Sequence, residues 1–164
     1  MKKVSDIHAI KIIFFITACY VGLWAIRIPT IKDQLQTDYV GVGYIMLSFA
    51  IGSIVAMIFA NALILKTSTK SILTCTLIAE GCLWLPVPFI QELWLFMVFS
   101  FVFGMSYGAF EIACNVYASN LEVREKKSMM SGFHAFWSLG VLFGSLITSF
   151  LLEWNYSFIF NILL

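Results

Sequence analysis

The fold class that the sequence predicts is an all-α membrane protein, and three observations predict it. Hydrophobic residues make up 61% of the chain, charged residues make up 12%, and the mean hydropathy is +0.94, whereas soluble domains are about half apolar and about a quarter charged. The apolar residues gather in runs of about 20 or more, the length that a helix needs to cross a bilayer. The charged residues stand mainly between these runs, as they do in the loops of a multi-pass membrane protein.

The apolar runs place the expected membrane spans along a single transmembrane bundle, residues 1–164. The spans are predicted at 9–28, 40–65, 71–90, 93–119 and 129–152, with a partial sixth span at 154–164. Pro29 is expected to end the first span, and Pro86 and Pro88 the third. The sixth run is too short to cross a bilayer. We therefore expect an incomplete sixth helix, in a truncated product, a partial sequence or half of a larger bundle.

The basic residues predict the orientation of the chain. If the spans alternate across the membrane, eight of the ten lysines and arginines fall on one side: Lys2, Lys3, Lys11, Lys66, Lys70, Arg124, Lys126 and Lys127. Cytoplasmic loops carry the excess of these residues, so the N-terminus is predicted to be cytoplasmic. The chain has no basic patch typical of nucleic-acid binding and no close-set Cys and His pairs. Nucleic-acid, metal and cofactor sites are therefore not predicted.

The fourth predicted span contains a carboxylate and an amide within an otherwise apolar stretch. Glu111 and Asn115 are four residues apart, so on a helix they share one face, which Gly104 and Gly108 continue toward the N-terminus. A charge at the centre of a span costs about 2.5–3.5 kcal/mol and usually faces a cavity or a partner. Glu111 is predicted to carry a proton, with Asn115 as its neighbour or as a substrate ligand. The alternative is a contact between helices.

Two further spans carry stripes at helical spacing. In the fifth span, polar side chains recur on one face while Gly140 and Gly144 form a small pair on another, the residues of the polar face being His134, Ser138, Ser145 and Thr148. We expect one face to line a path for water or solute and the other to pack. His134 is predicted either to relay protons with Glu111 or to bond a neighbouring group. Gly52 belongs to a row of small residues in the second span that favours close helix packing.

The first span contains the remaining candidate side chains. Tyr20, Trp24 and Arg27 follow one another at spacings of four and three, so they could form an aromatic and cationic lining for a hydroxylated or anionic solute. Arg27 could instead extend its charge to the membrane surface. In the third span, Glu80 is interpreted as a buried, protonated acid bonded to another helix.

Several of these residues resemble the patterns of a known family. Residues 27–32 and 131–140 are similar to the N-terminal half of major facilitator superfamily transporters of a bacterial inner-membrane, rhizopine-uptake-like branch. The span-four pattern resembles the fucose–proton symporter group at Gly104, Gly108, Glu111, Asn115 and Tyr117. The resemblance implies the six-helix N-terminal bundle of that fold, in the bacterial inner membrane, with the second six-helix half absent.

The resemblance also implies a function and roles for residues. The expected activity is proton-coupled secondary transport of a small polar solute such as a sugar or polyol, with protons, solute and lipid as partners. Glu111 would be the coupling acid and Asn115 a sugar ligand. His134 is expected to assist coupling, and the other substrate ligands are expected to be Tyr20, Trp24, Arg27, Trp137 and Ser138. Transport would require a second six-helix half or another protomer, so the chain alone is expected to transport little.

Two other functional classes are alternatives. The first is a non-transporting membrane protein, or an inactive transporter fragment, that acts only through helix–helix assembly. The second is a membrane-embedded enzyme, which ranks last because the spans contain no Ser–His–Asp order, no HExxH motif and no paired catalytic aspartates. The chain is therefore predicted not to be an enzyme.

Overall fold

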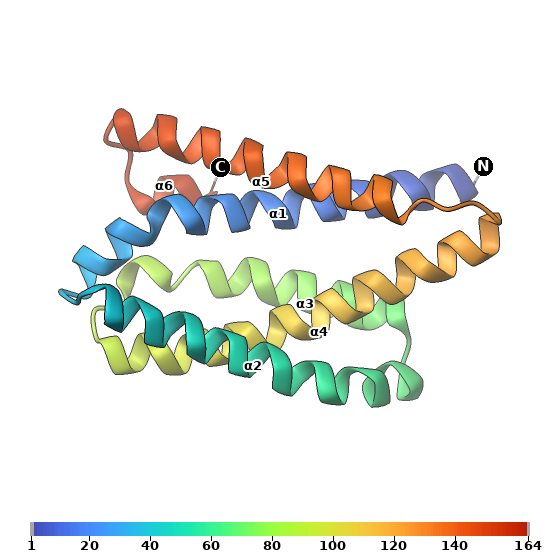
Figure 1. The fold of residues 1–164 in the computed structure, drawn as a ribbon, viewed down its shortest axis with the longest axis horizontal. Coiled ribbons are helices and arrows are strands. Elements are labelled where there is room, and N and C mark those ends of the chain that lie inside the picture. The colour runs from blue at the N-terminus through green and yellow to red at the C-terminus, as the bar shows by residue number, and fades with distance from the viewer. Residues whose placement is uncertain (1, 164) are drawn as a thin grey trace. The chain divides into compact units, whose positions relative to one another are not determined.

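The computed structural model describes residues 2–163, with side chains from residue 6 onward except those of 61 and 63. The described chain contains helices and no strand, which confirms the predicted all-α class (Figure 1). Its elements are α1 (Lys2–Gln34), α2 (Tyr39–Lys66), α3 (Thr69–Trp84), the 3₁₀ turn η1 (Val87–Phe89), α4 (Leu93–Glu125), α5 (Met130–Glu153) and α6 (Phe158–Leu163).

Five segments of the described chain are long and apolar enough to cross a membrane. They are Asp6–Gln34, Tyr39–Lys66, Thr69–Phe89, Leu93–Glu125 and Met130–Glu153. Their mean hydropathies lie between 1.6 and 2.2. The chain is therefore a multi-pass membrane protein by the length and composition of its helices.

The prediction that Pro29 ends the first helix is wrong. Pro29 lies inside α1, which continues to Gln34. Proline lacks only its own N–H, so one bond to the carbonyl four residues earlier is lost. The ladder then resumes, and the Leu35 amide donates to the Ile31 carbonyl at 3.0 Å.

Two other predicted boundaries also differ from the structure. α3 ends at Trp84, before Pro86 and Pro88, and the chain then forms η1 rather than a longer helix. α4 continues to Glu125, so much of the segment expected to be a charged loop is helical. For α3, each proline disfavours the helical conformation in the residue that precedes it, so the helix ends earlier than predicted. For α4, the apolar run predicts the part of the helix that lies in lipid, but the backbone hydrogen bonds of the helix continue beyond that part.

Three helices end in a left-handed residue that is not glycine. Gln36, Lys126 and Asn155 have φ values of 47°, 52° and 58°. In each case the next amide donates to the carbonyl five residues earlier: Thr37 to Lys32, Lys127 to Glu122 and Tyr156 to Leu151. This is the Schellman arrangement, which glycine usually provides. The sequence therefore carries no glycine signal at these three helix ends.

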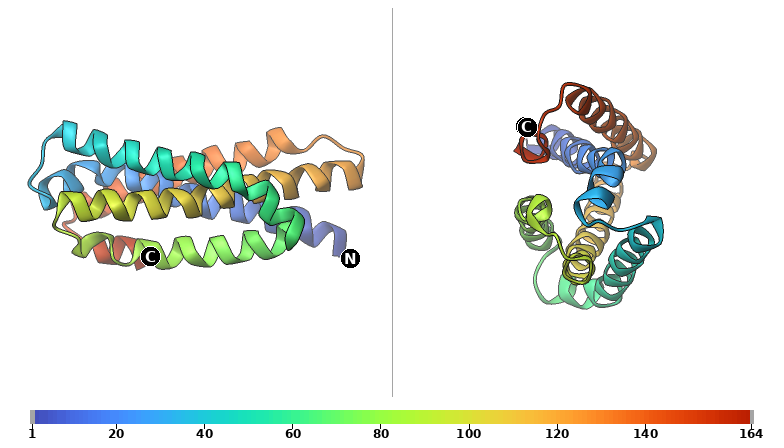
Figure 2. Two further views of the ribbon diagram at one scale, coloured as in Figure 1. Left: turned by 90° about the horizontal axis from the view of Figure 1, so that it is seen from below. Right: turned by 90° about the vertical axis from the view of Figure 1, so that its left-hand side faces the viewer.

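The chain divides into two compact units. Unit 1 comprises residues 2–28 and 118–163, and unit 2 comprises Pro29–Tyr117. In unit 1 the first part of α1 and α5 run in the same direction, side by side (Figures 1 and 2). Phe14 stacks on Phe133 with ring centroids 5.9 Å apart. Further along the same two helices, a Cβ on Gly144 would collide with the backbone of Cys19.

Unit 2 is built from α2, α3 and α4, with α3 antiparallel to the other two (Figure 2). Close contact between α2 and α4 depends on small residues, because a Cβ on Gly104 would collide with the Phe49 carbonyl and one on Gly108 with that of Ser53. The last turn of α1 also belongs to unit 2. There the Gln34 amide donates to the carbonyls of Val87 and Ile90 at 3.0 and 2.6 Å, which holds η1 in place.

The Gly104 contact can be tested with a matched glycine. Gly104→Ala should lower the free energy of unfolding by about 1–3 kcal/mol, because the new methyl group forces the two helix backbones apart. Gly43→Ala, on α2, meets nothing within 4 Å and should be neutral or stabilising by up to about 1 kcal/mol. Unfolding of the purified protein by SDS in mixed micelles measures both. Equal effects of the two substitutions would contradict the close approach.

Candidate functional site

Unit 1 contains a cavity of about 310 Å³ between α1, α5 and α6. Its walls are largely apolar, and its polar groups come from Tyr20, Thr148 and Asn161. Ligand pockets typically combine an apolar wall with a few placed polar groups and begin at about 300 Å³. The cavity is therefore of a size suited to a small solute.

A buried hydrogen-bond network adjoins this cavity. Arg27 is only 2% exposed, and its Nε donates to Asn161 Oδ1 at 3.1 Å. Its Nη2 donates to the carbonyls of Tyr156 and Ser157 at 3.3 and 3.5 Å. The Asn161 amide in turn donates to Thr148 Oγ1 at 3.3 Å. Asn161 and Thr148 thus belong both to the network and to the cavity wall.

The guanidinium of Arg27 is compensated only by neutral groups within the described part of unit 1. Its acceptors are one amide and two carbonyls, and it lies 5.1 Å from the ring centre of Phe158. Arg27 is therefore buried against α6 and the connection that precedes it. A buried charge without an ionic partner is costly, so this end of unit 1 favours an electron-rich or anionic group nearby.

The polar face of α5 has two different environments in unit 1. Ser145 Oγ donates to the Gly22 carbonyl at 3.4 Å, and Thr148 is bound by Asn161. Ser138 is exposed and donates to the carbonyl of His134, whose ring lies edge-on to Phe14. On this face of α5, Ser145 and Thr148 therefore form hydrogen bonds to α1 and α6. Only His134 and Ser138 present exposed polar side chains.

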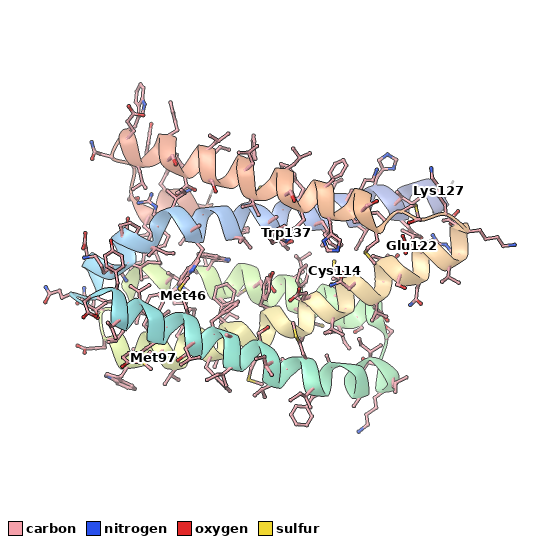
Figure 3. The ribbon with its side chains drawn as sticks, in the orientation of Figure 1. Met46, Met97, Cys114, Glu122, Lys127 and Trp137 are labelled. Atoms are coloured by element: carbon pink, nitrogen blue, oxygen red, sulfur yellow. The ribbon has the colours of Figure 1, made fainter. Side chains whose placement is uncertain are left out.

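The other predicted substrate ligands do not all reach the cavity. Tyr20 lines it, whereas Trp24 and Trp137 are half-buried and are not part of its wall. Figure 3 places Trp137 on α5. Of the six predicted substrate ligands, the cavity of unit 1 thus contains only Tyr20, supplemented by Thr148 and Asn161.

Glu111 and Asn115 lie in unit 2, on α4. The Asn115 amide donates to the backbone carbonyl of Glu111 at 3.0 Å, not to its carboxylate. Both side chains are half-buried. The Asn115 side chain therefore bonds within its own helix. Its amide oxygen can still accept a hydrogen bond from a ligand or a neighbour. Because His134 lies in unit 1, the proposed relay from Glu111 to His134 stays a prediction.

A second polar cluster in unit 1 fixes the start of α5. The Glu122 carboxylate accepts hydrogen bonds from the amides of Met129 and Met130, which would otherwise be unpaired. Figure 3 labels Glu122 at this connection between α4 and α5. Two residues further on, Arg124 forms ion pairs with Asp6 at 2.9 Å and Glu125 at 3.0 Å. These charges cap and connect helix ends.

Sequence reasoning missed Asn161. The signal was present, because Asn161 is the one polar residue of the described helix Phe158–Leu163. The principle that singled out Glu111, a polar group retained in an apolar run, applies equally to this amide. Its partners could not be predicted, since Arg27 precedes it by more than 130 residues.

Comparisons with known proteins give two kinds of match. A family model described as Major Facilitator Superfamily matches residues 12–164. The chain is similar to an uncharacterised MFS-type transporter of Yersinia pestis, with 29% identity over 87% of this chain and 37% of that protein. It is also similar to an uncharacterised transporter of Sinorhizobium fredii, with 25% identity over 80% of this chain and 35% of that protein. The chain thus spans little more than a third of these relatives. No solved structure gives a significant match.

The Arg27–Asn161 contact can be tested with a double-mutant cycle. Asn161→Leu should lower the free energy of unfolding by about 1.5–3 kcal/mol, because a buried guanidinium loses an acceptor. Arg27→Met should also destabilise, because it leaves the amide oxygen unpaired. The double variant should be more stable than the sum of the two losses by about 0.5–3 kcal/mol. Unfolding in mixed micelles measures all four proteins, and additive losses would contradict the contact.

Proposed function

Because this chain belongs to the major facilitator superfamily, we propose that the protein it builds is a proton-coupled secondary transporter of a small polar solute such as a sugar or polyol. The observation that carries this proposal is the 310 Å³ cavity of unit 1, whose polar groups stand beside a buried arginine. Hydroxyl and amide groups in an apolar wall suit a solute with several hydroxyl groups. Family membership favours transport over enzymatic activity.

Proton coupling is assigned to Glu111, with His134 as an assisting group. Glu111 is a half-buried acid in a helix long enough to span the membrane, and it forms no ion pair within the described chain. An acid of this kind is a candidate proton carrier by default. Asn115, Trp24, Trp137 and Ser138 are proposed as further solute ligands, outside the cavity of unit 1.

The setting of the protein is also part of the proposal. The span-one and span-five patterns support a place near the rhizopine-uptake-like branch, and the span-four pattern supports a likeness to the fucose–proton symporter group. We assign the chain to the bacterial inner membrane with a cytoplasmic N-terminus, on the basis of its basic loops. A second six-helix half, or another protomer, would complete the transport pathway.

A second candidate function is helix–helix assembly without transport. The hydrogen bonds of Ser145 and Thr148 favour it, because these side chains join α5 to α1 and α6. Solute binding separates the two functions. An assembly protein would gain no stability from any solute, whereas binding to the folded state alone raises stability with solute concentration.

Solute binding should depend on the hydroxyl of Tyr20. Tyr20→Phe should weaken the affinity for the preferred sugar or polyol about 5–10-fold, because one hydrogen bond contributes about 1 kcal/mol. Thermal stabilisation by a panel of sugars, polyols and their acidic derivatives identifies the solute and measures its affinity. Tyr44→Phe, an exposed tyrosine of α2, is the matched control. Equal affinities of the two variants would contradict a binding role for the cavity.

Proton coupling should depend on Glu111. In proteoliposomes that contain the product of the complete reading frame, Glu111→Gln should reduce accumulation driven by a pH gradient by at least about tenfold, a loss typical of a removed proton-transfer group. Exchange of labelled solute without a gradient should persist, because it requires no net proton movement. Glu92→Gln, an exposed acid before α4, should transport normally. Undiminished gradient-driven accumulation in Glu111→Gln would refute the coupling role.

A further inference from the structure

The chemistry of Arg27, Asn161 and Thr148 fixes the direction of the hydrogen bonds that join them. A guanidinium can only donate, so the Asn161 atom that lies 3.1 Å from Arg27 Nε is the amide oxygen, Oδ1. The amide nitrogen therefore faces the other way and donates to Thr148 Oγ1 at 3.3 Å. Both bonds thus point away from the positive charge and toward the wall of the unit 1 cavity, to which Asn161 and Thr148 belong.

This network ends in donor hydrogens that no described residue accepts. The hydroxyl of Thr17 donates to the Ile13 carbonyl at 2.8 Å, whereas that of Thr148 accepts from Asn161 and donates to no acceptor in the described part of the chain. The Asn161 amide nitrogen carries two hydrogens, and only one of them has a described acceptor. Thr148 is 1% exposed and Asn161 is 5% exposed. Because buried donors are rarely left unused, the cavity favours a ligand that accepts hydrogen bonds.

A single positive charge stands behind these donors. Arg27 forms no ion pair with a described acid, and Glu153, the acid at this end of unit 1, is exposed. Lys11 precedes Arg27 by about four helical turns. The other cations of unit 1 with described side chains lie beside the start of α5, whereas the cavity lies near its end: Arg124, Lys126 and Lys127. One negative charge on the ligand would therefore balance the charge at the cavity.

We propose that the cavity of unit 1 binds a small organic anion with one carboxylate, an acidic derivative of the sugars and polyols considered above. The carboxylate oxygens accept from the Thr148 hydroxyl and from the second N–H of Asn161. Arg27 balances the negative charge through Asn161 and does not touch the solute. A phosphate monoester fits less well, because it carries nearly two negative charges at neutral pH. This inference rests on the proposed function and specifies the chemical class of its solute.

Binding of matched acids and neutral analogues to the purified chain in nanodiscs tests the proposal. The pairs are gluconate with sorbitol, galacturonate with galactose and glycerate with glycerol, at neutral pH, where carboxylic acids are ionised. At least one acid should bind about tenfold more tightly than its neutral partner, because hydrogen bonds to a charged group are about twice as strong as neutral ones. Saturable thermal stabilisation measures the affinities, and sodium chloride at equal ionic strength is the salt control.

Variants of the network should change this preference. Asn161→Asp places a carboxylate against Arg27, so it should neutralise the guanidinium and lower the ratio of acid to neutral affinity about tenfold. Arg27→Gln keeps a donor but removes the charge, and should lower the ratio similarly. Arg27→Lys should retain the preference for the acid, and Tyr44→Phe should match the wild type. If Arg27→Gln does not fold, Asn161→Asp still decides, because it preserves a partner for Arg27.

Three results would overturn the inference: no saturable binding of any acid, equal or tighter binding of the neutral partners, or an unchanged affinity ratio in Asn161→Asp. The outcome is separable from transport. Saturable binding of a neutral sugar or polyol without preference for its acid refutes the anion site and supports the proposed solute class. An acid that binds through this network but is not taken up by proteoliposomes containing the product of the complete reading frame refutes the proposed transport and supports the anion site.

Discussion

Close approach of helix backbones is the constraint on which the rest of each unit depends. In lipid there is no hydrophobic force to press helices together, so packing and hydrogen bonding must do so. Gly144 in unit 1 and Gly104 in unit 2 provide backbone contacts that a methyl group would prevent. Only with α1 and α5 this close can a hydroxyl such as that of Ser145 reach the Gly22 carbonyl. The polar contacts between these helices therefore depend on the small residues that let the backbones approach.

The polar groups then divide by unit. Unit 1 gathers hydrogen-bond donors and one guanidinium around a cavity, and unit 2 carries an acid on each of two helices, Glu80 on α3 and Glu111 on α4. Neither unit mixes a buried arginine with a buried acid in its described part. The cavity proposed to bind solute and the acid proposed to carry the proton, Glu111, therefore lie in different units.

The sequence was sufficient to predict the fold class and the number of long apolar helices, because these depend on composition and on run length. It was insufficient for the helix ends, since Gln36, Lys126 and Asn155 adopt a conformation for which glycine is the usual signal. It singled out Arg27 but not the amide that binds it. Asn161 lies far along the chain from Arg27, and no periodicity reports contacts at that separation.

Pro29 stands at the point where α1 passes from unit 1 to unit 2. The other crossing, between Tyr117 and Ala118, is made by the uninterrupted α4. Bending α4 would lengthen hydrogen bonds, whereas α1 already lacks the bond that its proline cannot donate. The two connections are therefore unequal in backbone hydrogen bonding: the chain crosses between the units once at a residue that cannot donate a helical bond, and once where every residue can.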